Sequence, residues 1–239
     1  MPADIVDIHT HLLPGVDDGA VDWDETRDML YLASQQGIQT IIATPHFSRK
    51  QDPGRLRELA AQLSEEARQI SAGMRVFLGQ ELMYFDSLVD YLKRGEALTL
   101  ADSRYVLVEF LPNVTYKNLY QWVRKIMMAG YNPIIAHVER YRSVKTEEQI
   151  RELTAAGCYL QMNYSSIEGT IFDADARWCR KLLLGDHIHF LATDMHHSDR
   201  RAPVIEKSFK WLERNLDDEQ LSLITNKHAQ RLILNQSIK

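Results

Sequence analysis

The sequence predicts an α/β protein built as a distorted seven-stranded, TIM-like (β/α)7 barrel. Three observations lead to this prediction: short runs rich in β-branched residues recur at fairly even spacing, helical patterns lie between them, and most of the runs end in a His, Asp or Glu. Nearly continuous apolar strands that alternate with helices are typical of a buried parallel sheet. Because the strands of such a barrel all end on one face, we expect a metal site at their carboxyl ends.

Seven short apolar segments have the composition of buried strands. In chain order they are residues 4–8, 40–44, 75–79, 105–109, 133–137, 158–162 and 188–192. Five segments have helical periodicity, namely 23–37, 53–70, 116–130, 146–157 and 173–185. The second of these is clearly amphipathic, with Leu56, Leu59 and Leu63 on one side. The alternation of the two kinds of segment predicts successive βα units.

The composition indicates one globular domain over residues 1–239, with C-terminal helices from about residue 204. The 239 residues are 45% hydrophobic and 26% charged, and no linker rich in Pro, Gly or Ser interrupts them. Such a composition excludes disordered and collagen-like classes, and one barrel of this length is common. The 28 Lys and Arg against 33 Asp and Glu give a net charge of −5 without a basic stripe, so we expect no nucleic-acid partner.

We expect a cytoplasmic location with no direct insertion into a membrane. The N-terminus lacks a basic segment followed by an apolar run, so it does not resemble a signal peptide. No stretch approaches the roughly 18–20 apolar residues of a membrane helix. Cys158 and Cys179 cannot form a disulfide framework and belong to no Cys-x-x-Cys pair, which fits a reducing compartment. The sequence is compatible with a homo-oligomer.

Residues able to bind a metal follow six of the seven predicted strands. His9 and His11 form a His-x-His pair, and on an extended backbone side chains two residues apart point the same way. Histidines mixed with carboxylates, without thiolates, favour Mn²⁺, iron or Zn²⁺ over a structural cysteine-zinc site. The candidate ligands are too many for one ion, so we predict two or three ions with a bridging carboxylate. They are His9, His11, Asp18, His46, Glu81, Glu109, His137, Asp194 and His196.

A second His-x-His pair serves as an internal control for this prediction. A single His or Glu at a strand end is usually an ordinary hydrogen-bonded residue, but chance is a poor explanation for nine of them. His187 and His189 instead precede and enter the last predicted strand, so they should lie at the opposite face. We interpret these two as structural, and His197 and His228 as surface residues rather than ligands.

Three other hydrolytic mechanisms are excluded by their missing motifs. A cysteine phosphatase needs an Arg six residues after its Cys, but Tyr164 and Gly185 stand at those positions after Cys158 and Cys179. The Gly-x-Ser-x-Gly motif of serine hydrolases and the phosphate loop of P-loop NTPases are also missing. The metal-binding interpretation is therefore the one that the residues favour.

Six sequence motifs span residues 4 to about 203. In chain order they are DIHTHLLPGVDDGA, ATPH, GQE, LVEF, HVERY and TDMH. Together they resemble the polymerase and histidinol phosphatase (PHP) superfamily. Within it they resemble the bacterial CpsB/CapC/YwqE-type tyrosine-protein phosphatases of capsule and exopolysaccharide synthesis. The resemblance implies a distorted seven-stranded barrel that holds three metal ions, usually manganese.

The resemblance also implies a role for each matching residue. One ion would be held by His9, His11, Glu81 and Asp194. A second would be held by Glu81, Glu109 and His137, with Glu81 as the bridge, and a third by Asp18, His46 and His196. Arg140 and Arg201 would bind phosphate. We therefore expect the catalytic residues to be Arg140, Arg201, Asp194 and His196.

Two positions depart from the usual pattern of the family. Val138 replaces the usual proline of the HVER motif, and we expect this change to be harmless. Phe47 follows His46 where a second histidine is usual, and we expect it to alter the rim of the pocket and hence the choice of substrate.

The expected reaction is hydrolysis of a phosphomonoester by a metal-activated hydroxide. Three divalent ions carry more charge than the four ligand carboxylates, so the cleft would attract a dianionic phosphate. The leading hypothesis is a protein-tyrosine phosphatase acting on the tail of a membrane-associated, autophosphorylating tyrosine kinase that regulates capsular or exopolysaccharide synthesis. Two alternatives stay open: a small-molecule phosphatase of the histidinol-phosphate type, and a non-catalytic metal-binding module of the PHP type.

Overall fold

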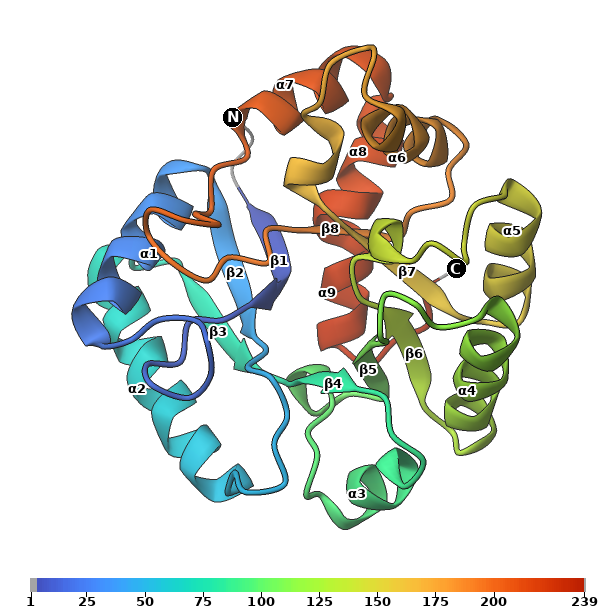
Figure 1. Ribbon diagram of the computed structural model, residues 1–239. Helices are drawn as coiled ribbons and strands as arrows, with labels where there is room; N and C mark the ends of the chain where they lie inside the picture. The colour runs from blue at the N-terminus through green and yellow to red at the C-terminus, as the bar shows by residue number, and fades with distance from the viewer. Residues whose placement is uncertain (1–3, 239) are drawn as a thin grey trace.

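A computed structural model describes residues 4–238 and shows parallel strands surrounded by helices (Figure 1). The strands are β1 (Ile5–Thr10), β2 (Ile38–Ala43), β3 (Arg75–Leu78), β4 (Glu81–Met83), β5 (Tyr105–Glu109), β6 (Asn132–Ile135), β7 (Tyr159–Asn163) and β8 (Phe190–Ala192). The helices are α1 (Trp23–Gln35), α2 (Pro53–Ile70), α3 (Leu88–Arg94), α4 (Tyr116–Met128), α5 (Glu147–Ala155), α6 (Ala174–Leu184), α7 (Glu206–Asn215), α8 (Asp218–Ser222) and α9 (His228–Ile233). The predicted α/β class with parallel strands is confirmed.

The strands form two parallel sheets that meet at their carboxyl ends. One sheet has the order β1-β2-β3 and the other β4-β5-β6-β7-β8. Isolated bridges link Thr10 to Met195 and His46 to Glu81. At the Thr10–Met195 bridge, the N–H of His11 donates to the carbonyl of Met195 (2.9 Å). Beside the His46–Glu81 bridge, the N–H of Phe47 donates to the carbonyl of Glu81 (2.9 Å). Both connections join segments that carry predicted site residues.

The third predicted strand, residues 75–79, corresponds to β3, and an unpredicted short strand, β4, follows it, so residues 4–238 contain eight strands rather than seven. The chain leaves the first sheet at Gly79 and Gln80, and Glu81 opens β4 in the second sheet. A Cβ atom on Gly79 would lie 2.6 Å from a methyl carbon of Leu100, so a side chain at this crossing would displace the buried Leu100. The Gln80 side chain accepts from the N–H of Leu98 (2.9 Å) and donates to Gln51 (3.0 Å), which fixes the crossing.

The predicted helices are present, with ends that differ by at most two residues, and each begins with a side-chain cap. Asp22, Asp52, Thr115, Thr146 and Asp173 accept from backbone N–H groups in the first turns of α1, α2, α4, α5 and α6. The short helix α3 was not predicted. No helix among the described residues is long and apolar enough to cross a membrane.

The C-terminal helix α9 closes the amino end of the strands. A buried cluster joins Val6 and Ile8 of β1 to Leu107 of β5, Phe190 of β8 and Leu232 of α9. Figure 1 shows α9 behind the strands, on the side away from their carboxyl-end loops. The fold therefore packs apolar side chains at the amino end of the strands.

Candidate metal and phosphate-binding site

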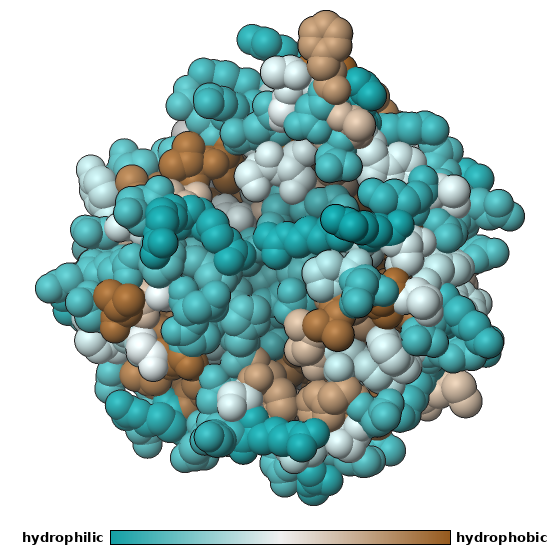
Figure 2. Space-filling view, viewed as in Figure 1, coloured by the Kyte–Doolittle hydropathy of each residue, from teal (hydrophilic) through white to brown (hydrophobic). Residues whose placement is uncertain are grey.

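All nine predicted metal ligands meet where the strands end. His9 lies in β1, Glu81 opens β4 and Glu109 ends β5. The other six lie in the segments that follow β1, β2, β6 and β8: His11, Asp18, His46, His137, Asp194 and His196. Figure 2 shows hydrophilic residues gathered at the centre of the face in view. Parallel strands alone place these residues together, although up to 187 positions of sequence separate them, as between His9 and His196.

Glu81 stands at the centre of the cluster, and its side chain is 1% exposed. Its Oε2 atom lies 3.2 Å from His9 Nε2, 3.4 Å from His11 Nε2 and 3.0 Å from His46 Nδ1. Its Oε1 atom lies 2.9 Å from His137 Nε2, which is itself 3.5 Å from Glu109 Oε1. One carboxylate therefore faces four imidazoles, which come from the ends of three strands, β1, β2 and β6.

A second focus lies around Asp18 and His196. Asp18 Oδ1 is 3.4 Å from His46 Nε2 and 3.6 Å from His196 Nε2. The rings of His11 and His196 have centroids only 3.8 Å apart. Potential ligand atoms converge within 4.8 Å in three groups: His11, Asp18, His46 and His196; His9, His11 and Asp194; and His46, Glu81 and Glu109.

The hydrogen bonds of the imidazoles test whether the cluster suits a cation. The Nδ1 atoms of His9, His11 and His196 lie beside oxygen acceptors, on Gln161 (3.1 Å), Asp17 (2.7 Å) and the Asp194 carbonyl (2.9 Å). With the proton on Nδ1, each Nε2 directs a lone pair inward. His9 Nε2 and His11 Nε2 are 3.3 Å apart, and the buried His196 Nε2 has no hydrogen-bond partner. Inward lone pairs beside carboxylates fit divalent cations.

Proton affinities in the cluster are strongly shifted. Burial disfavours charge on His9 and His46, but nearby carboxylates outweigh it and raise the pKa of His9 to about 10 and of His46 to about 9. Burial, His11 and Arg201 lower the pKa of His196 to about 4. His9, Arg140 and Arg201 overcome the effect of burial and lower the pKa of Asp194. Without a metal, protons balance the carboxylates, so metal binding would release protons.

Both predicted phosphate-binding arginines contact Asp194. Arg140 Nη2 lies 2.7 Å and Arg201 Nη2 2.6 Å from Asp194 Oδ2, and their side chains are 42% and 43% exposed. Asn163 Nδ2 donates to the same oxygen at 2.9 Å. The other oxygen, Asp194 Oδ1, faces His9 (3.4 Å) and His11 (3.6 Å). Asp194 thus connects the histidine cluster to an exposed pair of guanidinium groups.

Three of these residues have strained backbones. His137, Asp194 and Arg201 have φ values of 33°, 54° and 52°, in the left-handed region that non-glycine residues rarely adopt. Such conformations cost free energy and concentrate at functional sites. The strain coincides with the turns that direct the ends of β6 and β8 into the cluster.

The sequence analysis missed the polar residues that orient the ligands. The carboxylate of Asp17 accepts from His11 Nδ1 (2.7 Å) and from the N–H groups of His46 (2.8 Å) and Gly19 (3.0 Å). A Cβ atom on Gly19 would lie 2.2 Å from the His11 carbonyl oxygen, so this turn requires glycine. The neighbouring Asp17 and Asp18 therefore have different positions, one behind the imidazoles and one beside them.

The sixth predicted strand also contributes, with amides in place of ionisable groups. Gln161 Oε1 lies 3.1 Å from His9 Nδ1 and accepts from the His137 N–H at 2.7 Å, while Gln161 Nε2 donates to Asn163 (2.8 Å). Both amide residues are buried. The sequence signal was the spacing of Gln161 and Asn163, two residues apart in an otherwise apolar strand. This spacing places both amide side chains on the same face of the strand.

The control histidines lie at the other end of the strands. The N–H of His189 donates to the Leu160 carbonyl (3.0 Å), and His228 Nδ1 lies 2.9 Å from the His189 carbonyl. None of His187, His189 and His228 belongs to a group of converging ligand atoms among the described residues. His197 lies next to the cluster in sequence, but its Nδ1 lies 2.9 Å from Glu25 and it is only 17% exposed.

Comparison with known proteins agrees with this site. Residues 5–234 match the family described as "Capsular polysaccharide synthesis, CpsB/CapC". The tyrosine-protein phosphatase YwqE of Bacillus subtilis is 31% identical over 238 residues, covering 98% of this chain and 93% of YwqE. The tyrosine-protein phosphatase CpsB of Streptococcus pneumoniae is 29% identical over 243 residues, covering 98% of this chain and all of CpsB.

Solved structures agree as well. A chain from the crystal structures of YwqE and CpsB, described as unique metal-dependent tyrosine phosphatases, superposes with a TM-score of 0.88 at 30% identity. The match covers 98% of this chain and 96% of that one. A phosphotriesterase homology protein from Escherichia coli has a TM-score of 0.63 at 10% identity and shares the fold alone.

Proposed function

The chain belongs to the CpsB/CapC family, and from that premise we propose that it is a metal-dependent protein-tyrosine phosphatase. The observation that carries this proposal is the convergence of nine histidines and carboxylates, the predicted metal ligands, beside two exposed arginines. Its substrate would be the phosphotyrosine tail of an autophosphorylating kinase that regulates capsule or exopolysaccharide synthesis. Membership of the family is consistent with the PHP superfamily.

The proposed cofactor is Mn²⁺ in three sites. His9, His11, Glu81 and Asp194 would hold one ion, Glu81, Glu109 and His137 a second, and Asp18, His46 and His196 a third. When bound, such ions supply Lewis acidity, which lowers the pKa of coordinated water and neutralises phosphate oxygens. Asp17 and Gln161 would keep His11 and His9 in the tautomer whose Nε2 is free to bind.

Arg140 and Arg201 would orient the phosphate and stabilise the charge that develops on its oxygens. Asp194 occupies one nitrogen of each guanidinium, which leaves the other donors available. A cavity of about 190 Å³ lies beside them, lined by both arginines together with Asn163 and Thr193. A phosphate in this cavity would therefore receive donors from two fixed planar groups.

The leaving group favours phosphotyrosine over an alkyl phosphate. A tyrosine hydroxyl has a pKa of about 10, so it departs without full protonation. Each carboxylate of the cluster, Asp18, Glu81, Glu109 or Asp194, lies close to an imidazole or a guanidinium and is proposed as a ligand. None is therefore placed as a general acid, which an alkoxide leaving group such as that of histidinol phosphate would need.

Two further features belong to the proposal. We regard the two sheets as halves of one distorted barrel, supported by the bridges at Thr10–Met195 and His46–Glu81. A cytoplasmic location is supported by Cys158 and Cys179, which are both unpaired and buried.

Hydrolysis of three substrates in the presence of added Mn²⁺ tests the proposed function. We expect the protein to hydrolyse a phosphotyrosine peptide and p-nitrophenyl phosphate, and to hydrolyse histidinol phosphate far more slowly. Preference for histidinol phosphate would favour a small-molecule phosphatase. Turnover of none of the three, by protein that binds metal, would favour a non-catalytic module.

A further inference from the structure

A groove adjoins the arginine pair and lies between the β6–α5 loop and the start of α6. It has a volume of about 640 Å³, and Arg140 and Ser165 line both this groove and the smaller cavity beside Arg201. From these shared residues it extends to Lys145 and Trp178. A polypeptide whose phosphotyrosine reached the arginines would have this groove next to it.

Two cations in the groove have no ion-pair partner among residues 4–238. Arg142 and Lys145 line it and are exposed, and neither side chain forms an ion pair with any residue between 4 and 238. Exposed cations held near a site attract anionic segments and raise their local concentration. These two are therefore free to pair with carboxylates of a ligand.

Three carboxylates also line the groove, and two of them, Glu139 and Asp173, accept hydrogen bonds from the protein. Glu139 accepts from the N–H of Asn163 (3.1 Å) and from Ser166 Oγ (2.6 Å). Asp173 is the N-cap of α6 and accepts from two backbone N–H groups. Asp175 lies in the first turn of α6, where the helix dipole offsets a negative charge. The positive charge that is left for a ligand thus lies at Arg142 and Lys145.

The loop that precedes α6 exposes apolar surface beside the groove. Ile171 and Phe172, between the lining residues Gly169 and Asp173, are 71% and 85% exposed. Large apolar side chains exposed beside a groove are typical of surfaces that bind protein.

We propose that this groove binds the substrate polypeptide next to its phosphotyrosine and prefers an acidic residue opposite Arg142 and Lys145. The inference rests on the proposed function, because it assumes that phosphate is bound at Arg140 and Arg201. It adds to that function a determinant of which phosphotyrosines are chosen.

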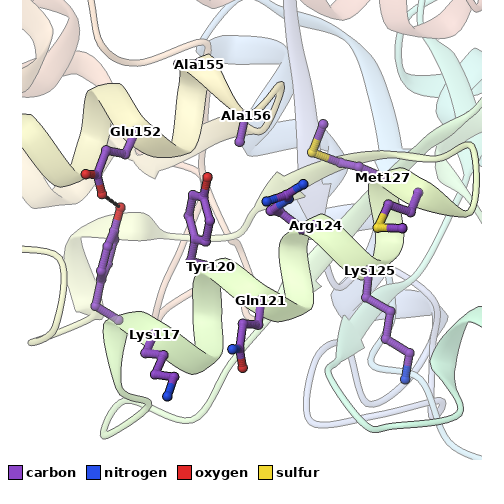
Figure 3. A pocket seen from close by; sticks show the side chains of 11 residues that line it. Lys117, Tyr120, Gln121, Arg124, Lys125, Met127, Glu152, Ala155 and Ala156 are labelled. Carbon is purple, nitrogen blue, oxygen red and sulfur yellow. Dashed lines mark hydrogen bonds between the residues drawn. The ribbon is translucent and has the colours of Figure 1, made fainter.

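A larger groove between α4 and α5 provides a matched control. It measures about 1240 Å³, and Figure 3 shows Tyr120 and Arg124 of α4 pointing toward α5, with Lys117 on the opposite side of the helix. Lys117 and Arg124 are exposed and form no ion pair among the described residues. This groove shares no lining residue with the cavity at Arg140 and Arg201.

The experiment compares two phosphotyrosine peptides that differ only in their flanking residues, Asp and Glu in one and Ser in the other. With Mn²⁺, wild-type protein should show a kcat/KM about five- to tenfold higher for the acidic peptide, through a lower KM. The preference should shrink as salt is added. The double variant Arg142→Gln/Lys145→Gln should lose it, and Lys117→Gln/Arg124→Gln should retain it.

A binding measurement separates this proposal from the proposed function. Fluorescence anisotropy of the labelled acidic phosphopeptide, in EDTA and without turnover, should show weaker binding to the groove variant than to wild type. If wild-type protein hydrolyses neither peptide, the phosphatase proposal fails and the anisotropy still decides on the groove. Equal affinities of wild type and the groove variant for the acidic phosphopeptide would overturn the groove proposal. Loss of the preference for the acidic peptide only in the Lys117→Gln/Arg124→Gln variant would overturn it as well.

Discussion

Two His-x-His pairs occupy opposite ends of the strands and have opposite properties. At the carboxyl end, His9 faces Glu81 and Asp194, and these carboxylates raise its pKa to about 10 despite burial. At the amino end, burial and the neighbouring His228 and His187 lower the pKa of His189 to about 4. The first pair is part of a converging ligand set, and the second packs beside Tyr159 and His228.

The difference shows that the position of the motif in the fold decides its chemistry. At the carboxyl end, residues in or directly after five other strands, β2, β4, β5, β6 and β8, bring carboxylates and imidazoles to the pair. At the amino end, the C-terminal helix α9 covers the strands with apolar residues such as Ala229 and Leu232. The same two-residue spacing therefore yields a candidate metal site in one place and a packed structural element in the other.

The largest expected effect concerns catalysis and tests the difference between the two histidine pairs directly. His9→Ala removes an imidazole from the cluster, and we expect kcat for p-nitrophenyl phosphate to fall at least about a hundredfold, because a proposed metal ligand is lost. His189→Ala should keep most of the kcat while lowering stability by about 1–3 kcal/mol. Steady-state kinetics and thermal unfolding of both variants check this. An equal fall of kcat in the folded His189 variant would contradict the assignment of the two ends.

The next effect concerns the arginines beside the cluster. Arg140→Ala should raise the activation free energy by about 2–4 kcal/mol, mainly through kcat, because one set of phosphate donors is lost. Arg140→Lys should restore activity only in part, since an ammonium lacks the planar pair of donors. Arg201 still contacts Asp194 Oδ2, so metal content should not change. Kinetics with metal analysis in parallel are the test, and an unchanged kcat/KM would make Arg140 an ordinary surface charge.

A smaller effect distinguishes the two ends by pH. Between pH 6.5 and 4 the unfolded chain protonates His189 and the folded protein does not, so His189 contributes a loss of stability as pH falls through this range. This loss is absent well above pH 6.5 and reaches about 2–3 kcal/mol at pH 4. His189→Asn keeps an acceptor for the Leu160 N–H without titrating. Urea unfolding from pH 4 to 7 should show the wild type losing stability relative to this variant. Parallel curves would refute the prediction.

The smallest expected effect concerns the cysteines. Burial raises the pKa of Cys179 to about 12 and raises that of Cys158 as well, so neither thiol is a nucleophile near neutral pH. Iodoacetamide should leave the folded enzyme's activity within about twofold, as expected for thiols that stay protonated and buried. Labelling of Cys158 or Cys179 would be measured by mass spectrometry. A loss of activity in proportion to this labelling would support a thiol mechanism instead.

The parts of the site that follow from strand direction could be predicted from the sequence. His9, Glu109 and His137 were recognised because a parallel strand fixes the end at which its last residue emerges. Nothing in the local pattern revealed that the chain changes sheets at Gly79, since that crossing depends on the contact with Leu100 and on the Gln80 side chain. The helix α3 is only seven residues long, too short for a clear periodicity.

Residues that act through neutral hydrogen bonds were the harder part. Gln161 and Asn163 carry no charge, so a search for ionisable ligands passed over the strand that orients His9 and Asp194. Asp17 could not be told from Asp18 by type or position, because the turn at Gly19 decides which carboxylate lies behind His11. The pairing of Arg140 and Arg201 on one oxygen depends on left-handed backbones at Asp194 and Arg201, which the sequence does not encode locally.

Reconstitution of metal-free protein tests most directly the claim that the carboxyl-end cluster is a metal-dependent phosphotyrosine site. Protein stripped with EDTA would be titrated with Mn²⁺ while bound metal and hydrolysis of a phosphotyrosine peptide are measured together, in wild type and in Asp194→Asn. The account predicts no activity without metal, recovery in proportion to bound metal in wild type, and reduced metal content with little recovery in the variant. Full activity of wild-type protein shown to be free of metal would contradict it.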